Sequence, residues 1–299
     1  MEIVVGTRGS HLALTQTGQV IEQLQSKHPG IRFVPKIIKT KGDRDQHTLL
    51  HKMDDKGIFI KELEDELLSG GIDMAVHSMK DMPSILPKGL ILANSPKREV
   101  AADVLVLKEG ASSLEELRNK KIGTGSKRRM FQLAQNKVLS VAIRGNIETR
   151  MEKIRTEGLD GVMLAAAGMI RAGYRDRISL YLDPQEFVPA ACQGILAIEI
   201  REDDRRMFSL IEAISDRDTN ICAETERAYL EEVGAGCHSP VGAYSVIEGD
   251  HVFLTVLFGT EDAGVLLKKK GNCRIGEHRK LAVSLARDIK GEVEKYEKR

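Results

Sequence analysis

The carboxylate of Asp81 is the first candidate for chemistry in this sequence. It belongs to residues 71–83, in which an apolar run that predicts a buried strand is followed by the polar residues His77, Ser78, Lys80 and Asp81. Open α/β sheets bind ligands at the carboxyl ends of their strands, so this loop is a predicted ligand site. The segment alone leaves a second interpretation open, in which Asp81 is a turn residue that accepts hydrogen bonds from backbone amides before Pro83.

Six arginines stand near junctions between predicted strands and helices. They are Arg8 before the credible N-cap Ser10, Arg128 and Arg129 at the start of a helix, Arg144 and Arg150 around Asn146, and Arg171 after the predicted strand 161–168. Cations at a helix N-terminus oppose its macrodipole at about 0.3–1 kcal/mol each, and an anionic ligand would explain them. Each arginine alone fits a solvated surface residue, but the five that lie in one αβ block, from Arg128 to Arg171, together predict a shared site for a polyanion. The turn that contains Arg8 predicts a separate, small anion site, and a turn that only caps its helix is an equally open alternative.

Cys237 is a candidate nucleophile because it stands in a turn between Gly236 and His238, where a thiol is accessible. A structural cysteine usually lies inside an apolar helix or strand, and on these grounds the two roles are equally open. The other cysteines, at positions 192, 222 and 273, complete no CxxC or metal-ligand spacing, so we expect free thiols and no metal.

Composition excludes several classes of partner. The 299 residues include 45 Lys and Arg against 44 Asp and Glu, so no overall charge marks a nucleic-acid-binding protein. The first residues lack the pattern of a signal peptide, and no run of about 18 apolar residues predicts a membrane span. We therefore expect a cytoplasmic protein without nucleic-acid or membrane partners.

The elements that must position these residues form two αβ blocks followed by a different pattern. We predict an α/β fold of two αβ lobes joined by a hinge at a cleft, with a small α+β domain at the C-terminal end. Residues 1–96 and 194–215 make the first lobe, residues 97–193 the second, and residues 216–299 the C-terminal domain. Within the second lobe, residues 113–116 (Ser-Leu-Glu-Glu) have the form of a capping box at a helix start.

Along essentially its whole length the sequence resembles the porphobilinogen deaminase family, also called hydroxymethylbilane synthases. The matching residues occur in the family's order: Gly6-Thr7-Arg8 with Ser10, Thr40-Lys41-Gly42-Asp43, Lys56-Gly57 with Phe59 and Lys61-Glu62-Leu63-Glu64, Ala75-Val76-His77-Ser78-Met79-Lys80-Asp81-Met82-Pro83, Arg128-Arg129, Arg144-Gly145-Asn146 with Thr149-Arg150, Leu164-Ala165 with Ala167-Gly168 and Arg171, Gln193-Gly194, and Gly236-Cys237 with Pro240.

The resemblance implies two lobes like those of periplasmic binding proteins and a third domain whose cysteine holds a dipyrromethane cofactor as a thioether. It implies a monomeric transferase of porphyrin and haem biosynthesis that joins four porphobilinogen molecules head to tail, with loss of ammonia, into hydroxymethylbilane. Asp81 would be catalytic by stabilising the cation left when ammonia departs. The resemblance assigns the cofactor to Cys237, Arg128, Arg129, Ser126, Thr124, Lys80 and Asp43, and the substrate to Arg8, Ser10, Arg144, Arg150, Arg171, Lys56 and Gln193.

The sequence departs from the family pattern at Gly125, Lys127, Cys192, His238 and Ser239, and residues 100–102 replace a more polar segment that contains proline. The family usually has glycine at position 192. No departure removes Asp81, Cys237 or a matched arginine. A rival class is a non-catalytic anion-binding module such as a solute receptor, which would have no use for Cys237.

Overall fold

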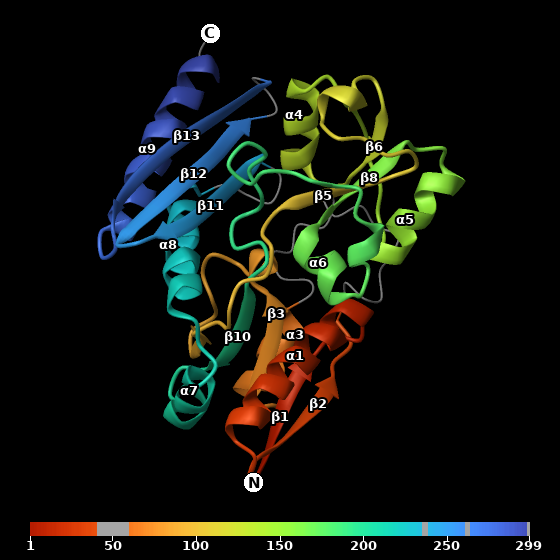
Figure 1. The fold of residues 1–299 in the computed structure, drawn as a ribbon. Helices are drawn as coiled ribbons and strands as arrows, with labels where there is room; N and C mark the ends of the chain where they lie inside the picture. Colours follow the sequence, from red (N-terminus) through yellow and green to blue (C-terminus); the bar gives the residue numbers. More distant parts are fainter. Residues whose placement is uncertain (41–59, 235–238, 261–263, 298–299) are drawn as a thin grey trace. The chain divides into compact units, whose positions relative to one another are not determined.

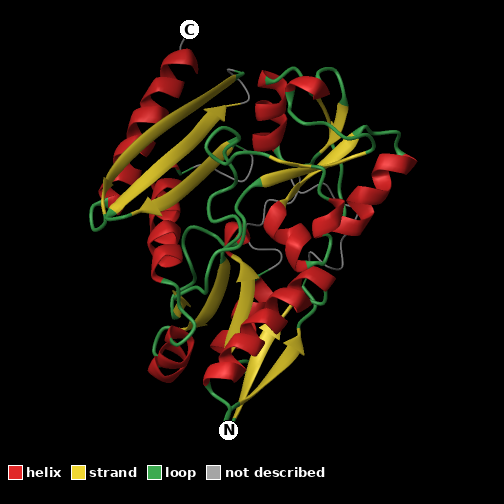
Figure 2. Cartoon of the chain, viewed as in Figure 1, coloured by secondary structure: helices red, strands yellow, loops and turns green. Residues whose placement is uncertain are grey.

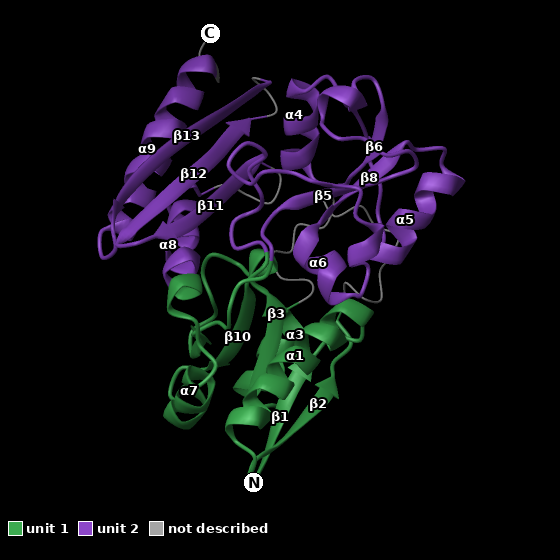
Figure 3. Ribbon diagram, viewed as in Figure 1, with its two compact units in different colours: residues 1–99, 194–220 green, residues 100–193, 221–299 purple. Residues whose placement is uncertain are grey.

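The computed structural model describes residues 1–40, 60–234, 239–260 and 264–297. The chain divides into two compact units, one formed by residues 1–99 and 194–220 and the other by residues 100–193 and 221–299 (Figure 3). Figure 2 shows the helices in red and the strands in yellow. Among the described residues, no helix is both long and apolar enough to span a membrane.

The first unit is built on a five-stranded sheet of order β2-β1-β3-β10-β4 (Figure 1). Its strands are β1 (Glu2–Thr7), β2 (Arg32–Ile37), β3 (Met74–Ser78), β4 (Leu90–Ala93) and β10 (Leu196–Arg201). The pairs β1·β2 and β1·β3 are parallel, whereas β10 runs antiparallel between β3 and β4. The predicted buried strand after residue 71 is therefore the central strand, and β10 lies beside it in the same sheet.

Helices cover both faces of this sheet, which explains the apolar sequence of β3. On one face, α1 (His11–Lys27) and α7 (Arg205–Glu212) pack Leu24 and Met207 into a core with Met74 and Val76. On the other face, α3 (Lys61–Leu68) places its buried leucines against Ala75. Gly70 follows this helix with φ +77°, the left-handed conformation of a helix-ending glycine.

The second unit begins with another five-stranded sheet, of order β7-β6-β8-β5-β9. Its strands are β5 (Asp103–Leu107), β6 (Lys121–Gly123), β7 (Leu139–Val141), β8 (Gly161–Ala165) and β9 (Leu180–Tyr181), and its helices are α4 (Lys127–Gln135), α5 (Ile147–Thr156) and α6 (Ala166–Arg171). The prediction of one strand over 161–168 is wrong, because the strand stops at Ala165 and α6 begins at once. A short apolar run does not by itself separate a strand from a helix, and alanines favour the helix.

The predicted capping box at residues 113–116 does not begin an α-helix. The segment forms only a short 3₁₀ helix, η3 (Glu115–Leu117), without a side-chain cap. The backbone N–H of Ser112 instead donates to Oε2 of Glu116 at 3.1 Å. The glutamate side chain thus accepts a hydrogen bond from the backbone, as in a capping box, but the donor is Ser112 and not the predicted Ser113.

The C-terminal module of this unit is an antiparallel sheet of β11 (Val241–Glu248), β12 (His251–Thr260) and β13 (Val265–Arg274), packed with α8 (Arg217–Val233) and α9 (His278–Glu297). Tyr229, Leu254 and Ala286 belong to its core. The sequence did not predict β13, which contains three consecutive lysines. Lysines suit this position because β13 is an edge strand, where charge discourages pairing with another sheet.

The predicted fold class, two αβ lobes with a small C-terminal α+β part, is confirmed by these three sheets and their helices. The predicted division into three domains stays a prediction. Compactness groups the C-terminal module with the second lobe, and the boundary at residues 220 and 221 falls inside α8.

Candidate functional site

Asp81 lies at the end of a one-turn 3₁₀ helix, η2 (Met79–Asp81), which follows directly on β3. Its side chain is exposed, and no hydrogen bond or ion pair engages its carboxylate in the part of the chain that the structure describes. The turn is closed by the backbone instead, since the N–H of Met82 donates to the carbonyl oxygen of Met79 at 3.1 Å. The interpretation of Asp81 as a turn residue therefore finds no support, and its carboxylate is available to a ligand.

The strand that leads to Asp81 carries a buried ionisable pair that the sequence reading missed. His77 Nε2 lies 3.1 Å from Oε2 of Glu199 on β10, and both side chains are buried. The second oxygen of Glu199, Oε1, is buried and has no hydrogen-bond partner among the described residues. Burial, and then the charge of Glu199, raise the pKa of the nearby Glu64, while His77 works in the opposite direction. Glu199 is the only acid in the apolar run 196–200, and an acid in such a run indicates that a buried partner is needed.

The turn after β1 has the predicted geometry. The backbone N–H of Ala13 donates to Oγ of Ser10 at 3.3 Å, so Ser10 is the N-cap of α1. Arg8 is partly buried in this turn, and Lys80 is partly buried within η2. The roles of these residues toward a ligand stay predictions.

Arg128 and Arg129 are both buried, and they share one carboxylate of the same unit. Nη1 of Arg128 donates to Oδ2 of Asp103 at 2.7 Å, while Nη2 and Nε of Arg129 donate to Oδ1 at 2.7 and 3.1 Å. Each arginine also reaches a backbone carbonyl, at Val188 and Met163 respectively. The sequence predicted exposed cations at the start of a helix, and the structure gives a buried charge cluster on the first residue of β5.

The charges of this cluster are strongly coupled. Burial raises the pKa of Asp103, but the charges and hydrogen bonds of Arg128 and Arg129 outweigh that effect and hold the pKa well below its ordinary value. Burial lowers the pKa of Arg128, and Asp103 counteracts the shift. Asp103 was missed from the sequence, where it appears only as a charge at the start of the apolar run 104–107.

Gln193 joins the same cluster. Its side-chain Nε2 donates to Oδ1 of Asp103 at 3.0 Å and to the carbonyl oxygens of Ala101 and Ala102, and only 1% of the residue is exposed. Contact of this amide with substrate stays a prediction, because its donors already have partners inside the protein.

The remaining predicted site residues of the second lobe lie near the ends of its helices. Ser126 is the N-cap of α4, with its backbone N–H directed to Oγ1 of the buried Thr124 at 3.3 Å. Asn146 caps α5 by accepting from the N–H of Thr149 at 2.8 Å, and Nε of Arg150 donates to the carbonyl oxygen of Gly145 at 2.7 Å. Two further arginines are partly buried, Arg144 before α5 and Arg171 as the last residue of α6.

Three predicted site residues lie outside the described residues, namely Asp43, Lys56 and Cys237. The nearest described landmark after Cys237 is the start of β11. A side chain added at Gly242 would meet the carbonyl oxygen of Pro189 at 2.6 Å and Cδ of Arg128 at 3.0 Å. The strand that follows Cys237 therefore packs closely against Arg128. Among the described residues there is no group of three or more His, Cys, Asp or Glu that could hold a metal ion.

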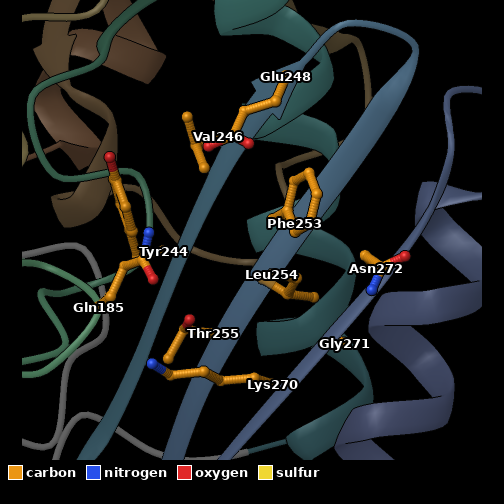
Figure 4. A pocket seen from close by; sticks show the side chains of 10 residues that line it. All are labelled: Gln185, Tyr244, Val246, Glu248, Phe253, Leu254, Thr255, Lys270, Gly271 and Asn272. Atoms are coloured by element: carbon orange, nitrogen blue, oxygen red, sulfur yellow. The ribbon is translucent and has the colours of Figure 1, made fainter.

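A cavity of about 350 Å³ lies elsewhere, on the face of the C-terminal sheet opposite its core (Figure 4). The cross-strand pairs Tyr244·Thr255 and Val246·Phe253 line it, together with Lys270. None of the predicted site residues contributes to its walls. Its size therefore says nothing about the chemistry above, which we assign from charge and hydrogen bonding.

Comparison with known proteins gives the family. Residues 3–209 match the family described as porphobilinogen deaminase, dipyromethane cofactor binding domain, and residues 220–291 match the porphobilinogen deaminase C-terminal domain. The chain is 48% identical to the porphobilinogen deaminase of Clostridioides difficile (strain 630), over 99% of this chain and 100% of that one. It is 42% identical to that of Bacillus subtilis (strain 168), over 89% and 86%.

Among solved structures, the fold is similar to an arginine-specific periplasmic binding protein of Salmonella typhimurium at 16% identity, with a TM-score of 0.39 over 77% of this chain and 97% of that one. The two family matches together span nearly the whole sequence, and the Clostridioides difficile relative aligns over essentially its full length. This chain belongs to the porphobilinogen deaminase family.

Proposed function

We propose that this protein joins four porphobilinogen molecules head to tail into the linear tetrapyrrole hydroxymethylbilane, as a cytoplasmic monomer. The observation that carries the proposal is the end-to-end relationship to porphobilinogen deaminases, with 48% identity over 99% of the chain. The exposed carboxylate of Asp81, which has no partner in the described part of the chain, and the arginines at strand-to-helix junctions add chemical support.

Each condensation breaks one bond and forms another. The methylene–nitrogen bond of porphobilinogen breaks and ammonia leaves, so a cation remains that is conjugated with the pyrrole ring. A carbon–carbon bond to the next ring then forms, and that ring loses the proton from the reacting carbon. Asp81 would stabilise the cation by charge, accept a hydrogen bond from the pyrrole N–H and relay protons between the departing and reacting groups.

The acidic side chains of the pyrroles set the second requirement. Every porphobilinogen carries an acetate and a propionate, so the growing chain is a polyanion that guanidinium groups can bind through two parallel hydrogen bonds. We propose this role for Arg8, Arg144, Arg150 and Arg171 toward the substrate, with Ser10, Lys56 and Gln193.

The described residues fit a dipyrromethane cofactor at Arg128 and Arg129. Two buried guanidiniums share one carboxylate there, which leaves a positive charge for an acidic ligand. We propose that these two arginines hold the cofactor's acidic side chains with Ser126, Thr124 and Lys80, that Asp43 also belongs to the cofactor site, and that Cys237 tethers the cofactor as a thioether. When bound, the cofactor supplies the terminal pyrrole carbon to which the first substrate is joined.

Intact-mass measurement of the purified protein tests the proposal and separates it from the anion-binding module. The enzyme should be heavier than its sequence by one dipyrromethane, whereas a receptor should match the sequence mass. Cys237→Ser should fold and lack the added mass, because an alcohol is a much poorer nucleophile than a thiolate. Peptide mapping that finds the adduct on Cys192, Cys222 or Cys273 would contradict the assignment of the tether.

Formation of hydroxymethylbilane from porphobilinogen by the parent protein is the direct assay. Arg144→Leu should slow the condensations while leaving the fold intact, since a carboxylate would lose a charge-assisted bond of roughly 1.5–3 kcal/mol. Lysine at this position should restore only part of the rate, because it does not offer the two-pronged geometry of arginine. A normal rate for Arg144→Leu would remove this arginine from the substrate site.

A further inference from the structure

Asp103 contacts three side chains that the family resemblance assigns to ligands. Its Oδ2 accepts a hydrogen bond from Arg128, and its Oδ1 accepts from Arg129 and from Gln193, at distances between 2.7 and 3.1 Å. The aspartate is fully buried as the first residue of β5. One carboxylate therefore organises donors from two distant parts of the second unit, the start of α4 and the turn at residue 193.

Stability alone is a weak explanation for this cluster. Buried ion pairs lose most of their Coulombic gain to desolvation, and apolar residues of similar volume often serve as well. Two guanidiniums against one carboxylate also leave a net charge of +1. In the described part of the chain, Asp103 is the only acid paired with either arginine. A buried charge without a counterion is costly, so the cluster is arranged for an anion.

The two arginines differ in how many of their guanidinium nitrogens are hydrogen-bonded within the protein. Arg129 directs Nε and Nη2 at Asp103 and Nη1 at the carbonyl oxygen of Met163. Arg128 makes both of its hydrogen bonds within the described chain through Nη1, to Asp103 and to the carbonyl oxygen of Val188. Nε and Nη2 of Arg128 make no hydrogen bond within the described chain. The edge that they form can bind a carboxylate through two parallel hydrogen bonds.

We infer that Asp103 is a positioning residue for the anion site: it holds Arg129 as a support and fixes Arg128 by one nitrogen, so that the Nε and Nη2 edge of Arg128 receives a carboxylate of the pyrrole ligand. This inference rests on the proposed function. Asp103 itself touches no ligand. Asparagine at position 103 would keep the shape, but it would remove the charge and turn an amide N–H toward a guanidinium.

The test uses a double-mutant cycle on cofactor loading. Apoprotein of the parent, Asp103→Asn, Arg128→Gln and the double variant is incubated with increasing porphobilinogen, and intact mass gives the concentration at which half of the folded protein carries the adduct. Asp103→Asn should raise this concentration by roughly ten- to a hundredfold, the equivalent of one charge-assisted hydrogen bond. The double variant should be little worse than Arg128→Gln, because Asp103 acts through that arginine.

Asp183 provides a matched control in the same unit. It is exposed and accepts a hydrogen bond from the backbone N–H of Gln185 at 2.9 Å, so Asp183→Asn should load like the parent. Independent effects that multiply in the double variant would overturn the inference, as would normal loading of Asp103→Asn. If Asp103→Asn does not fold, Asp103→Glu serves as the test, because it keeps the charge but displaces it. Loading of Asp103→Glu at the parent's concentration would also overturn the inference. A parent that never acquires the adduct would instead refute the proposed function.

Discussion

At the scale of single residues, Asp81 gives a direct test of the chemistry, because its exposed carboxylate has no partner in the described part of the chain. Asp81→Asn keeps the shape and removes the charge, so condensation should slow by a factor on the order of 10²–10³. Asp81→Glu keeps the charge but moves it by a methylene, and it should retain intermediate activity.

Single-turnover assays with the cofactor already in place would measure this series. Thermal unfolding serves as the control, and the three proteins should unfold at nearly the same temperature because the side chain makes no described contact to lose. An Asp81→Asn protein that condensed porphobilinogen as fast as the parent would exclude Asp81 from the mechanism.

Cys192 is a second residue whose geometry makes an unusual prediction. It is buried with φ +61°, a left-handed conformation that favours glycine, the residue that the family resemblance implies at this position. Cys192→Gly loses the thiol but removes strain on the order of 1–2 kcal/mol. Cys192→Ala loses the thiol and keeps the strain, so glycine should give the more stable protein, the reverse of the usual order.

Chemical denaturation of the two variants would decide the order of stability. Gly30 offers a control, because its backbone is not left-handed and a side chain added there meets nothing within 4 Å. Gly30→Ala should leave stability nearly unchanged or raise it slightly. If Cys192→Ala were as stable as Cys192→Gly, the backbone strain at this position would be negligible.

At the scale of elements, an ion-pair cluster joins β13 to the turn before Phe187. Lys268 and Lys270 donate to the two oxygens of Glu186 at 2.7 and 3.0 Å. Their hydrogen bonds and charges lower the pKa of Glu186 to about 2. A depressed carboxyl pKa contributes stability above the unfolded value, and this contribution disappears as the pH falls through the folded value.

Glu186→Gln should therefore flatten the dependence of stability on pH between about 4.5 and about 2, and it should lower stability at neutral pH. The glutamate is largely exposed, so each pair is expected to contribute only about 0.2–1 kcal/mol, and less at high salt. Denaturant unfolding at several pH values would measure the difference. Identical pH profiles for parent and variant would mean that the cluster does not stabilise the folded state.

The sequence predicted best those features that depend only on interactions between residues close together in the chain. Ser10 caps its helix as expected, because a cap depends on residues within one turn of the chain. The partners of Arg128 and His77 could not be predicted, since Asp103 and Glu199 come from strands far away in sequence that only the sheet order brings near. The edge strand β13 was missed because lysine is uncommon in strands in general, although it is typical of solvent-exposed edge strands.

At the scale of the whole molecule, the segment that leaves the first unit and the segment that returns to it lie side by side. It leaves the first unit after Glu99 and returns at Gly194, and within that unit the N–H of Glu99 donates to the carbonyl oxygen of Gly194 at 3.1 Å. Gly194 has φ +91°, and a side chain added there would collide with the carbonyl oxygen of Glu99. Gly194→Ala should therefore destabilise the protein by roughly 1–3 kcal/mol, since the crossing cannot relax without breaking that hydrogen bond.

Gly110→Ala is the matched control for this crossing, because a side chain there meets nothing within 4 Å and the backbone is not left-handed. Equilibrium unfolding should separate the two variants, with Gly110→Ala close to the parent. Equal stability of both would show that the crossing tolerates a side chain.

The position of β10 between β3 and β4 also fixes the order in which the lobes can be completed during synthesis. When the ribosome has made residues 1–99, β4 has been synthesised, but it has no strand to pair with until residues 196–201 emerge. In that interval the whole five-stranded sheet of the second unit, residues 103–181, leaves the ribosome with all of its strands present. The lobe that begins first is therefore finished second, and until then β3 offers an unpaired edge to other nascent chains.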